Sequence, residues 1–245
     1  MAMREVLRVR EVLPAPVPHP RTEPAIPRGE IPAARSVRRG PAEQVWYASY
    51  GSNMRLARLT CYLAGGVPPG SAHRHPGCRD PRPPRLASPV VLPGAMYFAT
   101  ESRLWTGGVA YYDPAVPGEV PGRAYLLTAS QFADVAAQEM HRPPGVDLDL
   151  TTVLRTGRAE LGPGRYETLV LVGHRAGVPV LTFTAPWAMA DVAPNAPSTA
   201  YLAMLATGLR EAHGWSPRRI AEYLATRPGA TGTWHQHDVE RLITS

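Results

Sequence analysis

The sequence Val45-Trp46-Tyr47-Ala48-Ser49-Tyr50-Gly51-Ser52-Asn53-Met54 decides the fold of this chain. Its apolar first half predicts a buried strand over 45–50, and the glycine allows a sharp bend where the strand ends. A helix is predicted over 54–64. This layout aims backbone N–H groups at one point and suits a small anionic group such as a carboxylate. A later segment holds a lone carboxylate, Glu139, that could work with this loop.

The composition indicates a globular protein with many turns. The chain has 245 residues, 44% of them hydrophobic, with 28 prolines and 22 glycines. All 26 basic residues are arginine, and the net charge is +6. A basic chain invites a nucleic-acid interpretation. No nucleic-acid motif accompanies the charge, so arginine-rich tails on an ordinary enzyme are the favoured interpretation.

Cysteine content and hydropathy give the expected compartment. Two cysteines, Cys61 and Cys78, do not make a disulfide framework. The N-terminal residues lack the apolar core of a signal peptide, and no stretch approaches the ~20 apolar residues of a membrane span. We therefore expect a cytoplasmic protein with no membrane contact. The sequence makes no prediction of its oligomeric state.

Proline spacing divides the chain into two parts. Residues 1–42 alternate proline, arginine and small residues, which forbids a helix or a central strand. We interpret them as an extended arm that can be disordered, with a short strand near 3–9. A folded domain is predicted over 43–245.

Turn and capping signals place the other elements of that domain. Thr128 and Gln131 form a capping box, Ser216-Pro217 is an N-cap followed by proline, Asn53 is a candidate N-cap, and Gly65-Gly66 is a helix stop. The sequence predicts strands over 95–100, 108–112, 120–127, 166–173 and 178–184, and helices over 128–140, 198–213 and 216–226. Strands come mostly first and helices last, which predicts an α+β fold.

Four separated segments then match one family in order and spacing. They are Tyr50-Gly51-Ser52-Asn53-Met54; Ser102, Trp105, Gly107, Gly108 and Ala110; Glu119-Val120-x-Gly122 with Gln138-Glu139; and Pro197-Ser198-x-x-Tyr201 with Gly208. Over about residues 44–215 the chain resembles the γ-glutamylcyclotransferase-like proteins.

This resemblance implies a fold and a site. The fold would be a small mixed β-barrel or a strongly curved sheet with flanking helices. The catalytic carboxylate would be Glu139, and the loop and Glu139 would meet in a cavity at one end. The substrate-binding residues would be Tyr50, Gly51, Ser52, Asn53, Met54 and Trp105.

The implied reaction is an intramolecular aminolysis that uses no metal or cofactor. The α-amine of a γ-glutamyl amide attacks the γ-carbonyl, closes 5-oxoproline and expels the amine. Glu139 would act first as base and then as acid. Backbone N–H groups of Gly51, Ser52 and Asn53 would hold the substrate α-carboxylate or the oxyanion, and the Tyr50 hydroxyl could add a hydrogen bond.

Three departures leave the substrate open. The family often has an aspartate, a glycine and a late-strand tyrosine where this chain has Ala136, Met140 and Phe183. One alternative keeps the fold and cavity but catalyses another acyl, amide or lyase reaction, as in secondary metabolism. Another is a non-catalytic binding protein whose basic arm meets an acidic partner. A serine hydrolase is disfavoured because Ser52 lies in no Gly-x-Ser-x-Gly elbow.

Other polar clusters have simpler interpretations. His73, His75 and Cys78 have metal-ligand side chains, with Cys61 as a fourth, but the arginine-rich surroundings disfavour a cation and favour a polar loop. The arginines at 79, 82 and 85 could ring the cavity mouth, although a solvated loop is the favoured interpretation.

Overall fold

The computed structural model describes residues 7–8, 43–68, 73–102 and 104–244. Most of the predicted arm, and most of the short strand near its start, lies outside these residues. Leu7–Arg8 forms strand β1, which pairs in parallel with β3. No helix among the described ranges is both long and apolar enough to cross a membrane.

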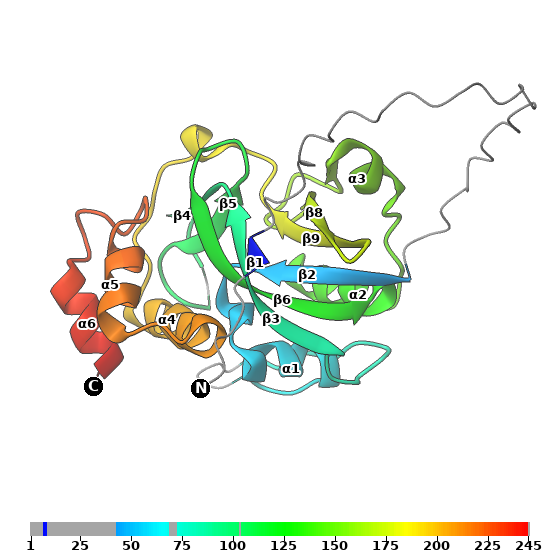
Figure 1. The fold of residues 1–245 in the computed structure, drawn as a ribbon, viewed down its shortest axis with the longest axis horizontal. Helices are drawn as coiled ribbons and strands as arrows, with labels where there is room; N and C mark the ends of the chain where they lie inside the picture. Colours follow the sequence, from blue (N-terminus) through cyan, green and yellow to red (C-terminus); the bar gives the residue numbers. More distant parts are fainter. Residues whose placement is uncertain (1–6, 9–42, 69–72, 103, 245) are drawn as a thin grey trace, which may run out of the picture.

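One mixed, open sheet organises the molecule (Figure 1). Its strand order is β1-β3-β6-β2-β9-β8-β7. These strands are β2 (Gln44–Ser49), β3 (Leu86–Pro93), β6 (Glu119–Thr128), β7 (Arg158–Glu160), β8 (Thr168–Arg175) and β9 (Val178–Thr184). A second sheet pairs β4 (Ala95–Ala99) with β5 (Val109–Asp113). The predicted α+β class and curved sheet are confirmed, and the sheet does not close into a barrel.

Strand β2 is the central strand of the sheet, and both of its faces are buried. It pairs antiparallel with β6 and parallel with β9. Trp46 and Ala48 pack into one hydrophobic core, whereas Val45 and Tyr47 pack into the other. Successive side chains of a strand point to opposite faces, so the unbroken apolar run is what a doubly covered strand requires.

Helices cover the two faces from different parts of the chain. The helices are α1 (Leu56–Ala64), α2 (Ala129–Glu139), α3 (Thr151–Thr156), α4 (Thr199–His213), α5 (Pro217–Ala225) and α6 (Gln236–Thr244). The core that contains Tyr47 is closed by α1, α2 and α3. The core that contains Trp46 is closed by α4, α5, α6 and the β4–β5 pair.

Most predicted elements are observed, and several capping predictions hold. The Thr128–Gln131 capping box is formed, Ser198 and Ser216 cap α4 and α5, and Gly65 ends α1 with a positive φ. The prediction that Asn53 caps the helix is wrong. A 3₁₀ turn over Ser52–Met54 precedes α1, whose N-cap is Arg55. Asn53 instead turns its side chain inward.

Among the strands and α-helices of the described residues, four were not predicted: β3, α3, β7 and α6. Strand β3 contains Pro89 and Pro93, which read as loop signals, yet it pairs along its length with β6. Proline is tolerated there because β3 lies near the sheet edge. On its outer side only the two-residue strand β1 pairs with it, at Val90 and Val91. Helix α3 and strand β7 are too short to show a periodicity.

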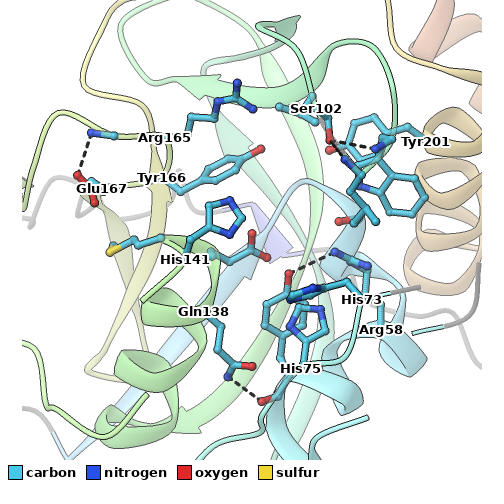
Figure 2. A pocket seen from close by; sticks show the side chains of 18 of the residues that line it. Arg58, His73, His75, Ser102, Gln138, His141, Arg165, Tyr166, Glu167 and Tyr201 are labelled. Atoms are coloured by element: carbon cyan, nitrogen blue, oxygen red, sulfur yellow. Dashed lines mark hydrogen bonds between the residues drawn. The ribbon is translucent and has the colours of Figure 1, made fainter. Parts of the chain in front are cut away.

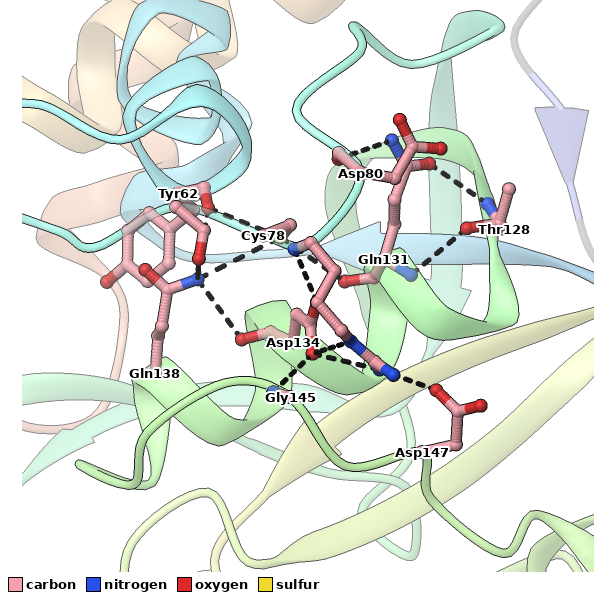
Figure 3. A network of polar contacts seen from close by, with 11 residues as sticks. Tyr62, Cys78, Asp80, Thr128, Gln131, Asp134, Gln138, Gly145 and Asp147 are labelled. Atoms are coloured by element: carbon pink, nitrogen blue, oxygen red, sulfur yellow. Dashed lines mark hydrogen bonds and ion pairs between the residues drawn. The ribbon is translucent and has the colours of Figure 1, made fainter.

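A polar face of α2 fixes this helix against the loop that follows α1 (Figure 3). Buried Asp134 accepts hydrogen bonds from the Arg79 guanidinium and from the backbone N–H groups of Arg79 and Gly145. The Gln131 amide donates to the carbonyls of Asp80 and Arg82. These contacts hold the helix whose last residue is Glu139.

We expect Asp134→Ala to lower the free energy of unfolding by about 3–5 kcal/mol, because it strands the donors that this buried carboxylate satisfies. Chemical denaturation followed by circular dichroism measures the change. Arg82→Ala is the matched control, because it removes only a surface pair with Asp80. Equal stability of the two variants would contradict the anchoring role of Asp134.

Candidate active site

The loop after β2 is held in place by its neighbours on three sides. The Tyr50 hydroxyl donates to the Phe183 carbonyl of β9 at 3.0 Å. The Tyr125 hydroxyl of β6 lies 2.9 Å from the Asn53 carbonyl oxygen and 2.8 Å from that of Met54. Helix α4 approaches closely at Gly208, where an added Cβ would lie 2.6 Å from Met54 Cβ. The loop is therefore rigidly positioned before any ligand binds.

Glu139 meets this loop directly. The buried Asn53 side chain donates from Nδ2 to Glu139 Oε1 at 2.7 Å and to the Tyr47 hydroxyl at 3.3 Å. Glu139 is half-buried at the C-terminal end of α2. A charge-assisted hydrogen bond of this length fixes the direction of the carboxylate.

The charge of Glu139 acts on the phenols around it. Burial raises the pKa of Tyr47 and Tyr62, and the nearby Glu139 carboxylate raises both further. Burial likewise raises the pKa of Tyr166 and Tyr201. These phenols stay neutral at physiological pH, so they can donate hydrogen bonds but cannot act as bases.

Glu139 lines a cavity of about 710 Å³ (Figure 2). Its walls include Ser52, Trp105, Tyr166 and Tyr201. A recess of about 30 Å³ adjoins it and is lined by Tyr50, Gly51, Ser52, Asn53 and Glu139, among others. Ser52, Glu139, Tyr166 and Tyr201 line both spaces. The loop and the carboxylate thus face one connected space.

The structure gives the predicted site residues different places. Gly51, Ser52 and Asn53 border the recess, and Trp105 lines the larger cavity. Tyr50 also borders the recess, although its hydroxyl is already bonded to Phe183. Met54 is only 2% exposed and lines neither space. It packs beneath the loop against α4.

The three departures from the family pattern lie in and near this site. Ala136 is buried in the core that contains Tyr47, and Met140 lines the cavity. The Phe183 ring stacks on Tyr47 with centroids 5.1 Å apart. Tyr166 supplies a phenol beside the recess instead, and its hydroxyl donates to the Ala110 carbonyl at 3.0 Å.

The loop after α1 carries no recognisable metal centre in its described part. Cys78 Sγ contacts the Tyr62 carbonyl at 3.3 Å, while the His75 ring packs against the Tyr62 ring at a tilt of 32°. Across the described ranges, no group of three or more histidine, cysteine, aspartate or glutamate side chains is placed to hold a metal. Arg79 and Arg82 pair with nearby aspartates and do not line the cavity.

Several cavity residues were missed by sequence reasoning, chiefly Arg58, Tyr62, His75 and Gln138. Of these residues, Arg58 is the one whose place in the cavity the sequence indicated most clearly. It lies four residues before Tyr62, and buried Leu59 and Leu63 flank the pair on α1. An arginine at helical spacing on an otherwise apolar face is an unusual placement. His75 and Gln138 are brought in only by the docking of the loop onto α2.

Comparisons with known proteins give limited similarity. No family model matches the chain. Histone deacetylase 5 of Arabidopsis thaliana is 31% identical over 212 residues, which cover 79% of this chain and 32% of that protein. The chain spans about a third of the length of that curated relative, whose name describes that whole protein.

The solved structures that resemble the chain include a gamma-glutamyl cyclotransferase, the family that the sequence motifs resemble. It is 16% identical, with a TM-score of 0.43, over 82% of this chain and 99% of that one. An uncharacterized protein from Homo sapiens is 16% identical with a TM-score of 0.42, over 83% and 99%. YkqA from Bacillus subtilis is 18% identical with a TM-score of 0.40, over 76% and 55%. At these scores the interpretation of the site rests on its own geometry.

We expect His75 to stay neutral well below the usual range of a histidine. Burial, together with the charges of Arg58 and His73, lowers its pKa to about 4. The unfolded chain takes up this proton near pH 6.5, whereas the folded chain resists until about pH 4. The free energy of unfolding should therefore fall as the pH drops through that window.

The ring chemical shifts of His75, assigned by comparison with His75→Gln, measure this directly by NMR. They should not change between pH 8 and 5. The stability of His75→Gln should depend less on pH in the same window. A titration midpoint near 6.5 in the folded protein would contradict the expectation.

Proposed function

We propose that this chain is a γ-glutamylcyclotransferase-type enzyme that converts a γ-glutamyl amine or amino acid to 5-oxoproline. The observation that carries the proposal is the 2.7 Å hydrogen bond from Asn53 to Glu139, which joins the loop and the carboxylate beside one cavity. The motif resemblance supports it, because the residues in contact are those that it implies.

The reaction needs little beyond folding the substrate. The α-amine attacks the γ-carbonyl, the new C–N bond closes a five-membered lactam, and the bond to the leaving nitrogen breaks. Because the attack is intramolecular, holding the chain in a ring-like pose supplies most of the proximity advantage. The walls of the recess include Tyr50, Tyr166 and Tyr201, whose hydroxyls are each hydrogen-bonded to a backbone group, and these walls would impose such a pose.

Glu139 moves the proton in this proposal. It takes one from the substrate ammonium, which makes the amine nucleophilic, and returns it to the leaving nitrogen. Asn53 fixes the carboxylate while the turn holds backbone N–H groups of residues 51–53 at the recess. Those groups hold the α-carboxylate or stabilise the developing oxyanion.

The nearest alternative is a related acyl, amide or lyase reaction in the same cavity. The observation that favours it is Met140, which lines the cavity where the family often has glycine. A thioether in the wall changes which group fits there without removing the loop or Glu139. A non-catalytic protein that binds an acidic partner through residues 1–42 remains a third possibility, and those residues lie almost wholly outside the described part of the chain.

We expect purified protein to release 5-oxoproline from at least one member of a panel of γ-glutamyl amino acids and γ-glutamyl amines, measured by mass spectrometry. Glu139→Gln should lower kcat/KM by about 10²–10⁴-fold, because the amide cannot accept the proton. The matched control is Glu222→Gln, an exposed carboxylate on α5.

Three outcomes separate the hypotheses. Full activity in Glu139→Gln would defeat the mechanism. If no panel member reacts while acyl or amide substrates of other classes are consumed in a Glu139-dependent way, the alternative reaction is favoured. Salt-sensitive binding to an acidic polymer that is lost on deleting residues 1–42 would favour the binding protein.

A further inference from the structure

Arg58 is a buried cation with unused hydrogen-bond donors. Its side chain is on α1, it lines the large cavity, and the residue is only 3% exposed. One nitrogen, Nη2, donates to the Tyr62 hydroxyl at 3.2 Å. Its Nε and Nη1 atoms are buried, and neither has a partner among the described residues. No salt bridge to Arg58 is found within the same residues.

Such an arrangement is costly for a side chain with only a structural role. A buried charge is stable when it is paired and its donors are satisfied. Two aromatic rings offset part of the cost, since the guanidinium carbon lies 5.4 Å from the Tyr62 ring centroid and 5.3 Å from that of Trp105. Cation–π contacts do not satisfy N–H donors. Arg58 therefore keeps its capacity for an anion.

The surroundings of Arg58 fit an anion that enters from the cavity. Figure 2 shows Arg58 on the same wall as His73 and His75. His75 also lines the cavity, and both of its ring nitrogens are buried. Buried Ser102 also lines the cavity, and its Oγ accepts hydrogen bonds from the N–H groups of Leu104 and Trp105. No acceptor for its hydroxyl proton is found among the described residues.

Arg58 also lies near the proposed reaction centre without belonging to the recess. The phenol of Tyr62 accepts its hydrogen bond, and the charges of Glu139 and Arg58 act on that phenol in opposite directions. Arg58 does not border the small space between the loop and Glu139. A ligand that reaches both would therefore extend from the recess into the larger cavity.

We propose that Arg58 forms an anion subsite that binds a carboxylate of the substrate through Nη1 and the N–H group of Nη2 that does not bond Tyr62. The planar guanidinium presents paired N–H groups that match the two oxygens of a carboxylate. The aromatic walls exclude water and strengthen this attraction. The carboxylate is either the α-carboxylate of the glutamyl group or one on the leaving group, and this part of the inference rests on the proposed function.

Binding is measured in a Glu139→Gln background, so that no probe is consumed. The probes are γ-glutamylalanine, which has two carboxylates, γ-glutamylethylamine, which has only the α-carboxylate, and glutarate, which is a plain dicarboxylate. Isothermal titration calorimetry compares the dissociation constant of each probe for this parent with those for the parent carrying Arg58→Met or Arg58→Lys. The matched control is Arg55→Met, a neighbouring arginine that does not line the cavity.

We expect Arg58→Met to weaken binding of γ-glutamylalanine about 10- to 100-fold, the worth of a charged hydrogen-bonded pair. Arg58→Lys should recover part of the loss, because it restores the charge without the planar fork. Arg55→Met should bind as the parent does. If γ-glutamylethylamine is weakened equally, the subsite holds the α-carboxylate. If it is unaffected, the subsite holds a carboxylate of the leaving group.

Two readouts keep this inference separate from the proposed reaction and from a structural role. Glutarate binding that depends on Arg58 upholds the subsite even if no γ-glutamyl compound is ever turned over. The melting temperature of Arg58→Met should equal or exceed that of the parent, because the substitution buries methionine in place of an unpaired charge. Unchanged binding of all three probes in Arg58→Met would overturn the proposal, as would failure of every probe to bind the parent. A lower melting temperature with unchanged affinity would assign Arg58 a structural role instead.

Discussion

The site depends on the hydrogen bond between Asn53 and Glu139, since it joins two segments that are 86 residues apart in the chain. One partner follows the central strand and the other ends helix α2. The bond can form only if the strand and helix pack in the right register. The Tyr47–Phe183 stack beneath it and the polar face of α2 beside it both maintain that register. The position of the carboxylate is therefore a product of the whole core.

The doubly covered sheet explains why these constraints coexist with an open cavity. Both faces of β2 are closed by helices, so the loop after β2 can only leave the sheet at the strand's end. Glycines allow the closest approaches there. A Cβ added to Gly122 would lie 2.6 Å from the Ser49 carbonyl oxygen, and a Cβ added to Gly208 would collide with Met54. These two motif glycines thus serve packing around the site.

The cavity wall combines neutral aromatic groups with charged side chains of both signs. The phenols of Tyr47, Tyr62, Tyr166 and Tyr201 are held neutral by burial, and His75 is held neutral for the same reason. Glu139 and Arg58 are an acidic and a basic group that both act on Tyr62, while Glu101, Arg165 and Glu167 also line the cavity. That separation of opposite charges suits a ligand that carries both an amine and a carboxylate.

The sequence alone determined the strand over 45–50, the glycine bend, the capped helix ending at Glu139 and the α+β class, because each depends on residues within a few positions of one another. It made Asn53 a candidate cap, predicted no strand over residues 86–93, and passed over Arg58. Only the tertiary structure decided these, since Asn53 acquires its role from Glu139, β3 from its pairing with β6, and Arg58 from the cavity wall that Trp105 completes. Local pattern fixes what a residue can do, whereas its partner atoms come from distant segments that packing alone brings together.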